Sequence, residues 1–565
     1  MKKILPLLVL VFLVGAGIRA INVWRPVDRP VWRETDEAGI ARNYVREGMN
    51  IFFPRVDWRG DTPGYAEMEF PAYPWLIAVS YKVFGQQEFL GRIISWIFSL
   101  LTLLVFFRLA ADLLPSSGAV FASIFFALSP LAINVSTSLQ PESLMFFLYL
   151  LSALLFVRFH RDQGDSYLWL SALAVGGAIL AKLPAAHIGL FFGLLLLEKY
   201  GLAAVGKLRV WAFGLIALLP GVAWYVHARS FWTKYQLSLG LSNEHHWVGT
   251  DILTNPHILL GIIRSEVLYV FTPLGVMVAL AALYLGRREK ALKYGLFWMV
   301  AIAAYYILAA RTTSAQWAAY YHIVSIPPAA LLFGIGVNGI YKLNRDPLWT
   351  RALTLISLSL TGAAGCAVWM YFSGVNEMNG FVLPVILLAS GALGYIAISR
   401  ATSPGSFRDS LAAMVGFACI FGTMGFQFRQ IAVDLDQWKD SELRSCARSF
   451  APMIPENALI LVTGGTCVNE TGKPAAYNAS FMHYWTDRRG FNICIEEQSI
   501  EGVEAYKRRG AEYYLVARSS LSRHPGLEQE MISKYPVMAQ CGDYYLLRLG
   551  QPFLAKDSRP QTPSS

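Results

Sequence analysis

The chain alternates long apolar stretches with short polar connections over its first 426 residues, and this pattern stops near residue 427. A helix that crosses a bilayer needs about 20 predominantly apolar residues. Stretches of this kind lie near 4–21, 88–108, 117–133, 141–158, 167–183, 184–199, 208–227, 266–285, 292–310, 322–341, 351–372, 380–398 and 409–426. They predict a polytopic α-helical membrane protein with about 13 transmembrane helices. The short pair 167–183 and 184–199 leaves a single bent or re-entrant element as an alternative.

Two regions fall outside the apolar pattern. Residues 22–87 are rich in Trp, Tyr, Pro and paired charges, which favours short amphipathic helices at the membrane interface. Residues 427–565 contain apolar runs at 458–463, 490–494 and 513–517 that resemble buried strands, and 500–510 resembles a helix that ends at Gly510. The sequence therefore predicts a transmembrane domain, 1–426, with a large first outer loop, 22–87, and a small exterior α/β domain, 427–565.

Composition supports the membrane class, because 55% of the residues are hydrophobic and only 15% are charged. The net charge of +10 lies in the segments predicted to face the cytoplasm, which hold 17 basic and 7 acidic residues, while residues 427–565 hold 16 of each. This distribution follows the positive-inside rule and gives no support to nucleic-acid binding. It predicts a multi-pass protein with a cytoplasmic N-terminus and a C-terminal domain on the outer side. Lys2 and Lys3 before the apolar run 4–18, with no clear cleavage site, predict an uncleaved N-terminal anchor. We expect the membrane to be a bacterial inner membrane and the C-terminal domain to be periplasmic.

Four of the six cysteines, Cys446, Cys467, Cys494 and Cys541, lie in the predicted exterior domain. In an oxidising compartment they could form two disulfides in any of three connectivities, or remain as buried thiols. Their spacing suits no zinc site.

Charged residues within or beside apolar stretches are costly, so they are candidates for function, the alternative being a structural pair or a side chain that reaches the interface. They are Arg92, Glu142, Lys182, Arg264, Glu266 and Arg311. Most fall near the predicted outer ends of the helices, so charges from distant parts of the chain are expected on one face.

The adjacent carboxylates Asp36 and Glu37 lie in the first outer loop. Such a pair could supply a general base and a second acid that holds a hydroxyl or a metal, whereas the simpler interpretation is a helix start capped by Thr35. Tyr320, Tyr321 and His322 are divided between an aromatic interface belt and phosphate binding. His245, next to His246, favours a solvated loop or sugar contacts over a metal ligand pair.

The order and spacing of short motifs resemble a known family. They are Asp36-Glu37, Ala41-Arg42, Gly48-Met49, Glu69-Phe70-Pro71, Phe84-Gly85, Glu88, Gly91-Arg92, Pro141-Glu142, Gly176-Gly177 through Lys182 with Pro184, Pro220 with Trp224-Tyr225, and Arg311 through Tyr320-Tyr321-His322 with Pro327-Pro328. Most of residues 1–342 thus resembles the C-type glycosyltransferases that use a lipid-phosphate sugar, which include protein O-mannosyltransferases and the lipid A aminoarabinose transferase.

The resemblance implies an enzyme that moves a sugar from polyprenyl phosphate to a protein hydroxyl, lipid A or surface glycan, with inversion at the anomeric carbon. It implies Asp36 as general base, with Glu37 and Glu142 as supporting acids. The residues implied to bind substrate are Glu69, Arg42, Arg92, Lys182, Arg311, Tyr320, Tyr321, His322 and His245. No cofactor is certain, and a divalent metal is compatible with the acidic residues.

Two positions depart from the family pattern. Phe70 stands where many relatives carry a lysine before the proline, and Gly39 stands where the aminoarabinose transferases carry arginine. The rival prediction is a lipid or solute transporter or flippase, since many helices and buried charges could also form a polar path. The chain shows no internal repeat, which favours the enzyme.

Overall fold

A computed structural model describes residues 4–28, 31–240, 255–343, 407–436, 441–468 and 480–550. The chain divides into two compact units. The first, here called the helical unit, combines residues 1–26, 69–227 and 244–439. The second, the sheet unit, combines residues 27–68, 228–243 and 440–565. The sheet unit therefore draws on both predicted domains, and the predicted boundary near residue 427 stays a prediction.

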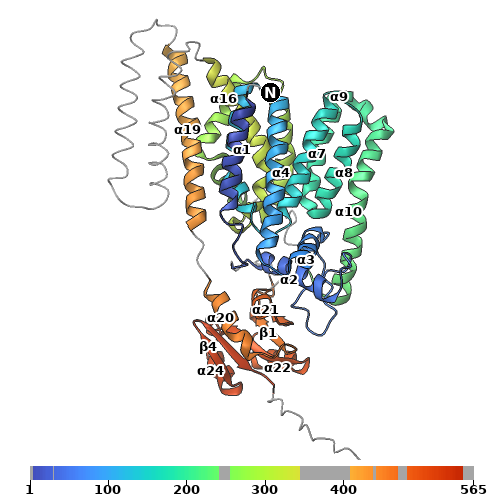
Figure 1. Cartoon of the computed structure of the whole chain (residues 1–565), viewed down its shortest axis with the longest axis vertical. Helices are drawn as coiled ribbons and strands as arrows, with labels where there is room; N and C mark the ends of the chain where they lie inside the picture. The colour runs from blue at the N-terminus through green and yellow to red at the C-terminus, as the bar shows by residue number, and fades with distance from the viewer. Residues whose placement is uncertain are drawn as a thin grey trace, which may run out of the picture. The chain divides into compact units, whose positions relative to one another are not determined.

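The helical unit is built almost entirely from apolar helices. Its longer elements are α1 (Leu5–Ala20), α3 (Ala72–Phe84), α4 (Phe89–Leu113), α5 (Ser116–Ala127), α6 (Pro130–Val135), α7 (Glu142–His160), α8 (Ser166–Ala181), α9 (Ile188–Tyr200), α10 (Leu208–Tyr235, which continues into the sheet unit), α12 (Pro256–Ser265), α13 (Pro273–Leu285), α14 (Leu292–Leu308), α16 (Ile326–Leu343) and α19 (Phe407–Asp436). Helices α4, α7 and α8 pack side by side (Figure 1). Helix α16 packs on α5, α13 and α14.

The described residues include five helical stretches that are long and apolar enough to cross a membrane: Phe89–Leu113, Glu142–His160, Leu183–Gly206, Leu208–Tyr235 and Ala318–Lys342. The bent pair Pro256–Phe271 and Pro273–Leu285 makes a sixth if it counts as one span. The chain is thus a polytopic helical membrane protein, but the prediction of about 13 spans is not supported.

The difference arises mainly because several apolar stretches are shorter as helices than as sequence patterns. Four apolar helices have only 10–17 residues: Leu5–Ala20, Ser116–Ala127, Ser166–Ala181 and Leu292–Leu308. The predicted span 117–133 is divided, because α5 ends at Ala127 and Ser129 caps a new helix that begins at Pro130. The predicted spans 351–372 and 380–398 lie outside the described residues.

Close helix contacts in this unit depend on small residues. A Cβ atom on Gly334 of α16 would lie 2.5 Å from the carbonyl oxygen of Gly118 on α5. Glycine at both positions lets the two backbones approach, which is the usual way in which membrane helices associate without a hydrophobic driving force.

The helical path is interrupted between the two short apolar stretches 167–183 and 184–199. Helix α8 ends at Ala181, and Lys182 has an extended backbone before the 3-10 turn η1 (Leu183–His187), which has Pro184 as its second residue. The two short apolar stretches are therefore separate elements, joined at a lysine.

The sheet unit contains a five-stranded mixed sheet with the strand order β2-β1-β3-β5-β4. The strands are β1 (Leu459–Thr463), β2 (Gly490–Ile493), β3 (Ala511–Ala517), β4 (Val537–Cys541) and β5 (Tyr544–Arg548). Strands β2, β1 and β3 are parallel, and β3, β5 and β4 are antiparallel. The three predicted strands and the α/β class of this domain are confirmed.

Helices α20 (Glu442–Phe450), α21 (Ser480–Thr486), α22 (Ile500–Arg508), α23 (Arg518–Leu521) and α24 (Leu527–Lys534) belong to the same unit. Helix α22 ends where the sequence predicts, because Gly510 has a φ of +106° that favours glycine. Leu461, Tyr514 and Leu547 form the centre of the core, with Val503 and Met531 packed from the helices.

The sheet unit also includes α2 (Trp32–Glu47), which lies in the first predicted outer loop and packs against α21. Two disulfides tie the unit together, Cys446 to Cys541 and Cys467 to Cys494. This selects one of the three connectivities that the spacing leaves open.

Candidate active site

The acidic pair of the first loop lies within α2. Trp32 begins the helix, and Asp36 and Glu37 follow in its second turn. Both side chains are buried, with exposed fractions of 3% and 0%. A carboxylate is rarely buried without a charged or hydrogen-bonding partner, so the surroundings of each decide what it can do.

Asp36 is held on one side. Its Oδ1 accepts a hydrogen bond from the indole Nε1 of Trp58 at 2.7 Å, and its Oδ2 has no hydrogen-bond partner among the described residues. Burial raises the pKa of the Asp36 carboxyl to about 7, although Trp58 and the guanidinium of Arg33 act in the opposite direction. A group that titrates near neutrality suits a general base.

Glu37 is paired along its own helix. Its Oε1 lies 3.4 Å from Nε of Arg33, four residues earlier. This arrangement is typical of an i, i+4 ion pair that stabilises a helix. Glu37 therefore has a structural partner within α2, whatever its part in catalysis.

Arg42 lies one and a half turns beyond Asp36 and is surrounded by acids. Its Nη2 donates to Oδ2 of Asp57 at 2.7 Å, and its Nη1 lies 2.8 Å from Oδ1 of Asp487. The guanidinium also lies over the ring of Tyr484, 4.9 Å from its centroid. These contacts favour a structural ion pair over the substrate-binding role that the sequence predicts.

The second oxygen of Asp57 is also used, because Oδ1 accepts from the side-chain amide of Asn43 at 2.8 Å. Burial favours the neutral acid, but Arg42 and Asn43 outweigh burial and lower the pKa of Asp57. Position 39 must be small here, since a Cβ atom on Gly39 would lie 2.8 Å from Oδ2 of Asp57. This gives a physical reason why glycine, and not arginine, stands at that position.

A second group of predicted residues meets within the helical unit. Glu142 opens α7 and forms an ion pair with Lys182, the residue that directly follows α8. Glu142 is 1% exposed, and the positive end of its helix also favours a carboxylate there. The sequence placed these two residues 40 positions apart, and the packing of α7 on α8 brings them together.

Two tyrosines complete this group. The ammonium of Lys182 lies 4.8 Å from the ring centroid of Tyr320 and 4.7 Å from that of Tyr321. The two rings stack on each other with their centroids 4.5 Å apart. Tyr320 and Tyr321 thus contact Lys182, the residue predicted to bind the phosphate. A belt of aromatic residues at the membrane interface would not require this contact.

His322 follows directly but faces other partners. Its Nε2 donates to the carbonyl oxygen of Thr313 at 2.8 Å, because a carbonyl can only accept, and its Nδ1 lies 2.6 Å from Oε1 of Glu266. His322 is fully buried. The pair joins two of the predicted charged or polar candidates, and it stabilises the join between η5 (Gln316–Ser325) and η4 (Glu266–Phe271).

Arg92 has a structural role in the described chain. Its three guanidinium nitrogens donate to the carbonyl oxygens of Arg25, Thr137 and Pro26 at 2.7 to 3.0 Å. It is fully buried and links α4 to two connecting segments. Of the remaining candidates, Glu69 is buried, Arg311 is half-buried in α15 (Ala310–Thr313), and His245 lies outside the described residues.

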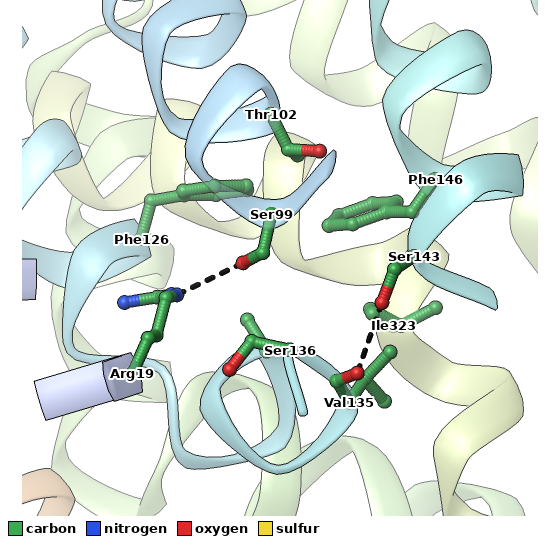
Figure 2. A pocket seen from close by; sticks show the side chains of 10 residues that line it. Arg19, Ser99, Thr102, Phe126, Val135, Ser136, Ser143, Phe146 and Ile323 are labelled. Carbon is green, nitrogen blue, oxygen red and sulfur yellow. Dashed lines mark hydrogen bonds between the residues drawn. The ribbon is translucent and has the colours of Figure 1, made fainter. Parts of the chain in front are cut away.

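The sequence analysis does not single out Arg19, which is buried in α1 with an exposed fraction of 1%. Its Nη1 donates to the last carbonyl of α5, on Ala127, at 2.7 Å, and its Nε donates to Ser99. Figure 2 shows Arg19 and Ser99 beside a small cavity that Ser136, Ser143 and Phe146 also line. The cavity has room for about one water molecule. The sequence feature that could have indicated this buried charge is a single arginine directly after 15 apolar positions.

One group of three potential metal ligands, Cys467, Cys494 and Glu496, occurs among the described residues. Its two cysteines form a disulfide, so their sulfurs are not available as thiolates. This group therefore leaves Glu496 as its one available ligand and does not support a metal site.

Residues 63–225 match the profile of the dolichyl-phosphate-mannose-protein mannosyltransferase family. This segment contains Glu69, Arg92, Glu142 and Lys182. The chain is a membrane glycosyltransferase of the kind that uses a lipid-phosphate sugar. The family resemblance seen in the sequence motifs is confirmed.

Solved structures share the fold of this glycosyltransferase. ArnT from Cupriavidus metallidurans bound to undecaprenyl phosphate is 15% identical, with a TM-score of 0.58 over 97% of this chain and 98% of ArnT. The archaeal oligosaccharyltransferase AglB from Archaeoglobus fulgidus, in complex with an inhibitory peptide and a dolichol-phosphate, is 11% identical, with a TM-score of 0.53 over 91% of this chain and 69% of AglB. No curated protein matches this glycosyltransferase in sequence.

Proposed function

We propose that this glycosyltransferase moves a sugar from a polyprenyl phosphate to an acceptor hydroxyl, with Asp36 as general base. The observation that carries the proposal is the match of residues 63–225 to the dolichyl-phosphate-mannose-protein mannosyltransferase profile. The ArnT structure holds undecaprenyl phosphate and the AglB structure holds a dolichol-phosphate, which supports a donor of the same chemical class.

The proposed step exchanges one carbon–oxygen bond for another. The acceptor oxygen attacks the anomeric carbon, and its proton passes to Asp36. The bond from the anomeric carbon to the phosphate oxygen breaks, and polyprenyl phosphate leaves with the electron pair. Attack from the face opposite the phosphate inverts the anomeric centre.

Asp36 has the properties that this step needs. One oxygen is fixed by the indole of Trp58, and the other is left without a protein partner in the described chain, so it is the atom that would accept the proton. A pKa near 7 keeps about half of the carboxyl groups ionised at neutral pH. Glu37, paired with Arg33, serves in the proposal as a supporting acid.

Lys182 is the proposed cation for the donor phosphate. Negative charge grows on the phosphate as the bond breaks, and a fixed ammonium stabilises that charge. Glu142 holds the lysine by an ion pair, and the rings of Tyr320 and Tyr321 restrict its position. The two hydroxyl groups of these tyrosines are further proposed donors to phosphate oxygens.

The remaining predicted residues keep weaker proposed roles. Glu69, Arg311 and His245 are proposed substrate contacts on the resemblance alone. Arg42, Arg92 and His322 are already engaged with protein groups, so we propose that they organise the surrounding structure.

We further propose that the protein acts in a bacterial inner membrane, on undecaprenyl phosphate, and delivers the sugar on the periplasmic side. The acceptor is proposed to be a protein hydroxyl, lipid A or a surface glycan. The cytoplasmic excess of positive charge supports this orientation.

Purified protein in detergent, given radiolabelled polyprenyl-phosphate mannose or polyprenyl-phosphate aminoarabinose with cell-envelope extract, tests the proposal. Release of labelled sugar to an acceptor or to water is expected, with at least a hundredfold loss in Asp36→Asn. Asp61→Asn is the control, because Asp61 is an exposed partner of Arg509. Movement of intact lipid across sealed liposomes without bond cleavage would instead establish the transporter.

A further inference from the structure

We propose that Trp58 is a positioning residue for Asp36, and that the C-terminal α/β domain holds Trp58 in place. The inference rests on the proposed function of Asp36. It gives the C-terminal domain an indirect part in the catalytic step, through Trp58, although the domain contains none of the predicted catalytic residues.

The first observation is the contact between the two side chains. The indole Nε1 donates to Oδ1 of Asp36 at 2.7 Å, and the exposed fractions of Trp58 and Asp36 are 7% and 3%. A charged acceptor makes this hydrogen bond stronger than one between neutral groups. It fixes the plane of the carboxyl group and therefore the direction in which the free Oδ2 points.

The second observation is that the backbone around Trp58 is bonded to the domain. The carbonyl oxygen of Asp57 accepts from the amide of Gly490 at 3.1 Å, and the amide of Gly60 donates to the carbonyl oxygen of Gly490 at 2.6 Å. Gly490 is the first residue of β2 and pairs with Ile460 of β1. Trp58 thus lies between two hydrogen bonds to the edge of the sheet.

The close approach at this edge depends on two glycines. Gly60 has a φ of +56°, and a Cβ atom there would lie 2.2 Å from the ring of Phe491 in β2. A Cβ atom on Gly490 would lie 1.7 Å from the carbonyl oxygen of Ile460. Only glycine lets the loop, β2 and β1 come together in this way.

The third observation is that the same loop is hydrogen-bonded to α2, the helix that carries Asp36. The side chain of Asp57, next to Trp58, accepts from both Arg42 and Asn43 of α2. The loop is therefore bonded to the sheet through its backbone and to α2 through a buried ion pair. Trp58 is held at a set distance from Asp36 by groups on both sides.

The electrostatic surroundings of Asp36 give the proposal a measurable consequence. The hydrogen bond from Trp58, the positive charge of Arg33 on the same helix and the hydroxyl of Ser480 from α21 each lower the pKa of the Asp36 carboxyl. The negative charge of Asp57 in the loop raises it. Burial raises its pKa, and the hydrogen bond from Trp58 lowers it. Removal of the indole donor should therefore raise the pKa further.

The alternative is that Trp58 only fills the core of the sheet unit. In that case its substitution would reduce stability and the amount of active protein, but it would not move the pH at which activity appears. The pH profile therefore separates a positioning role from a structural one.

Trp58→Phe and Trp485→Phe form a matched pair for the test. Trp485 is also buried in the sheet unit, but its Nε1 donates at 2.8 Å to the backbone carbonyl of Val27 instead of a carboxylate. Both variants lose one indole hydrogen bond and a similar volume. The rate of label release from polyprenyl-phosphate mannose or aminoarabinose is measured in the full chain from pH 5.5 to 9.5, with folding checked by gel filtration and thermal melting.

We expect the acidic limb of kcat/KM for Trp58→Phe to move upward by about one pH unit. This corresponds to about a fivefold loss at pH 7 and near-recovery at pH 9.5, where Asp36 is ionised in both proteins. Trp485→Phe should keep the wild-type profile. A folded Trp58→Phe variant with an unshifted limb would overturn the positioning role, whereas full activity in Asp36→Asn would overturn the proposed function itself.

Hydrogen exchange tests the part assigned to the domain. The amide of Gly60 should be protected and should open together with the amides of β2 as denaturant is added, since both belong to one bonded edge. Free exchange at Gly60 while β2 stays protected would show that the domain does not hold the loop.

Discussion

Arg42 and Asp57 form a buried ion pair in which the guanidinium Nη2 lies 2.7 Å from the carboxylate Oδ2. The two residues are 15 positions apart, and the pair joins α2 to the loop that carries Trp58. Sequence motifs predict a substrate contact for Arg42, but its exposed fraction is 4% and its donors face Asp57, Asp487 and the carbonyl of Tyr484. The pair therefore has a structural role next to the proposed base Asp36.

Asp57→Ala should lower the stability of the protein by about 3 kcal/mol or more, because the Arg42 charge would stay buried with one partner fewer. Thermal melting of the purified full chain measures this loss. Asp61→Ala is the control, since its pair with Arg509 is about half exposed on both sides and should contribute less than about 1 kcal/mol. Equal losses in the two variants would contradict the buried-pair account.

Asp36→Asn should stabilise the protein increasingly as the pH rises. The folded-state pKa is about 7 and the ordinary value is 3.8, so between these values the folded protein keeps a proton that the unfolded chain has released. Wild-type stability therefore falls as the pH rises through this window, and asparagine removes the effect. From pH 5 to pH 8 the advantage of the variant should grow by on the order of 2 kcal/mol.

Melting temperatures of wild type and variant at pH 5, 6, 7 and 8 check this linkage. Asp61→Asn is again the control, because its ion pair lowers the pKa of Asp61 and predicts no gain at high pH. If the difference between wild type and Asp36→Asn is the same at every pH, the Asp36 carboxyl does not titrate near neutrality.

Lys182→Met should reduce sugar release at least a hundredfold, because the departing phosphate would lose its proposed cation. The variant also leaves Glu142 buried without its partner, which should destabilise the fold. The double variant Lys182→Met with Glu142→Gln removes both charges, so it should recover stability without recovering activity. Recovery of both would limit the pair to a structural role.

Lys293→Met provides the matched control for this lysine. Lys293 pairs with Glu198, and the side chains are 33% and 40% exposed. Loss of an exposed pair should leave both melting temperature and sugar release close to the wild-type values.

Removal of the two disulfides should have unequal effects on the sheet unit. The bond between Cys446 and Cys541 spans 95 positions, and the bond between Cys467 and Cys494 spans 27. In the chain-entropy description the longer loop contributes about 1 kcal/mol more. Hydrogen-exchange protection of β3 should therefore fall further in the Cys446→Ser, Cys541→Ser variant than in the Cys467→Ser, Cys494→Ser variant.

Peptide mapping without reductant should first recover these two pairs from the wild type. Recovery of any other connectivity would contradict the arrangement of α20, β2 and β4. A larger loss of protection from the shorter loop would contradict the loop-entropy argument.

Local composition was enough to determine the class of this protein. Runs of apolar residues with few charges exclude a soluble fold, and the change in pattern near residue 427 marks the region that forms the mixed sheet. The order of short motifs was enough to indicate the family, and the profile that matches residues 63–225 includes the motifs that contain Glu142 and Lys182. The number of spanning helices did not follow from composition in the same way, since an apolar run does not show where a cap such as Ser129 divides it.

Only the tertiary structure decided which charges are already engaged. Arg92 is bound by carbonyls of Arg25, Pro26 and Thr137, while Lys182 meets Glu142 and two tyrosines. It also joined residues 27–68 to the C-terminal domain and so placed Trp58 beside Asp36. These outcomes depend on hydrogen bonds and packing between residues tens to hundreds of positions apart, and no local pattern of apolar and polar residues encodes such partners.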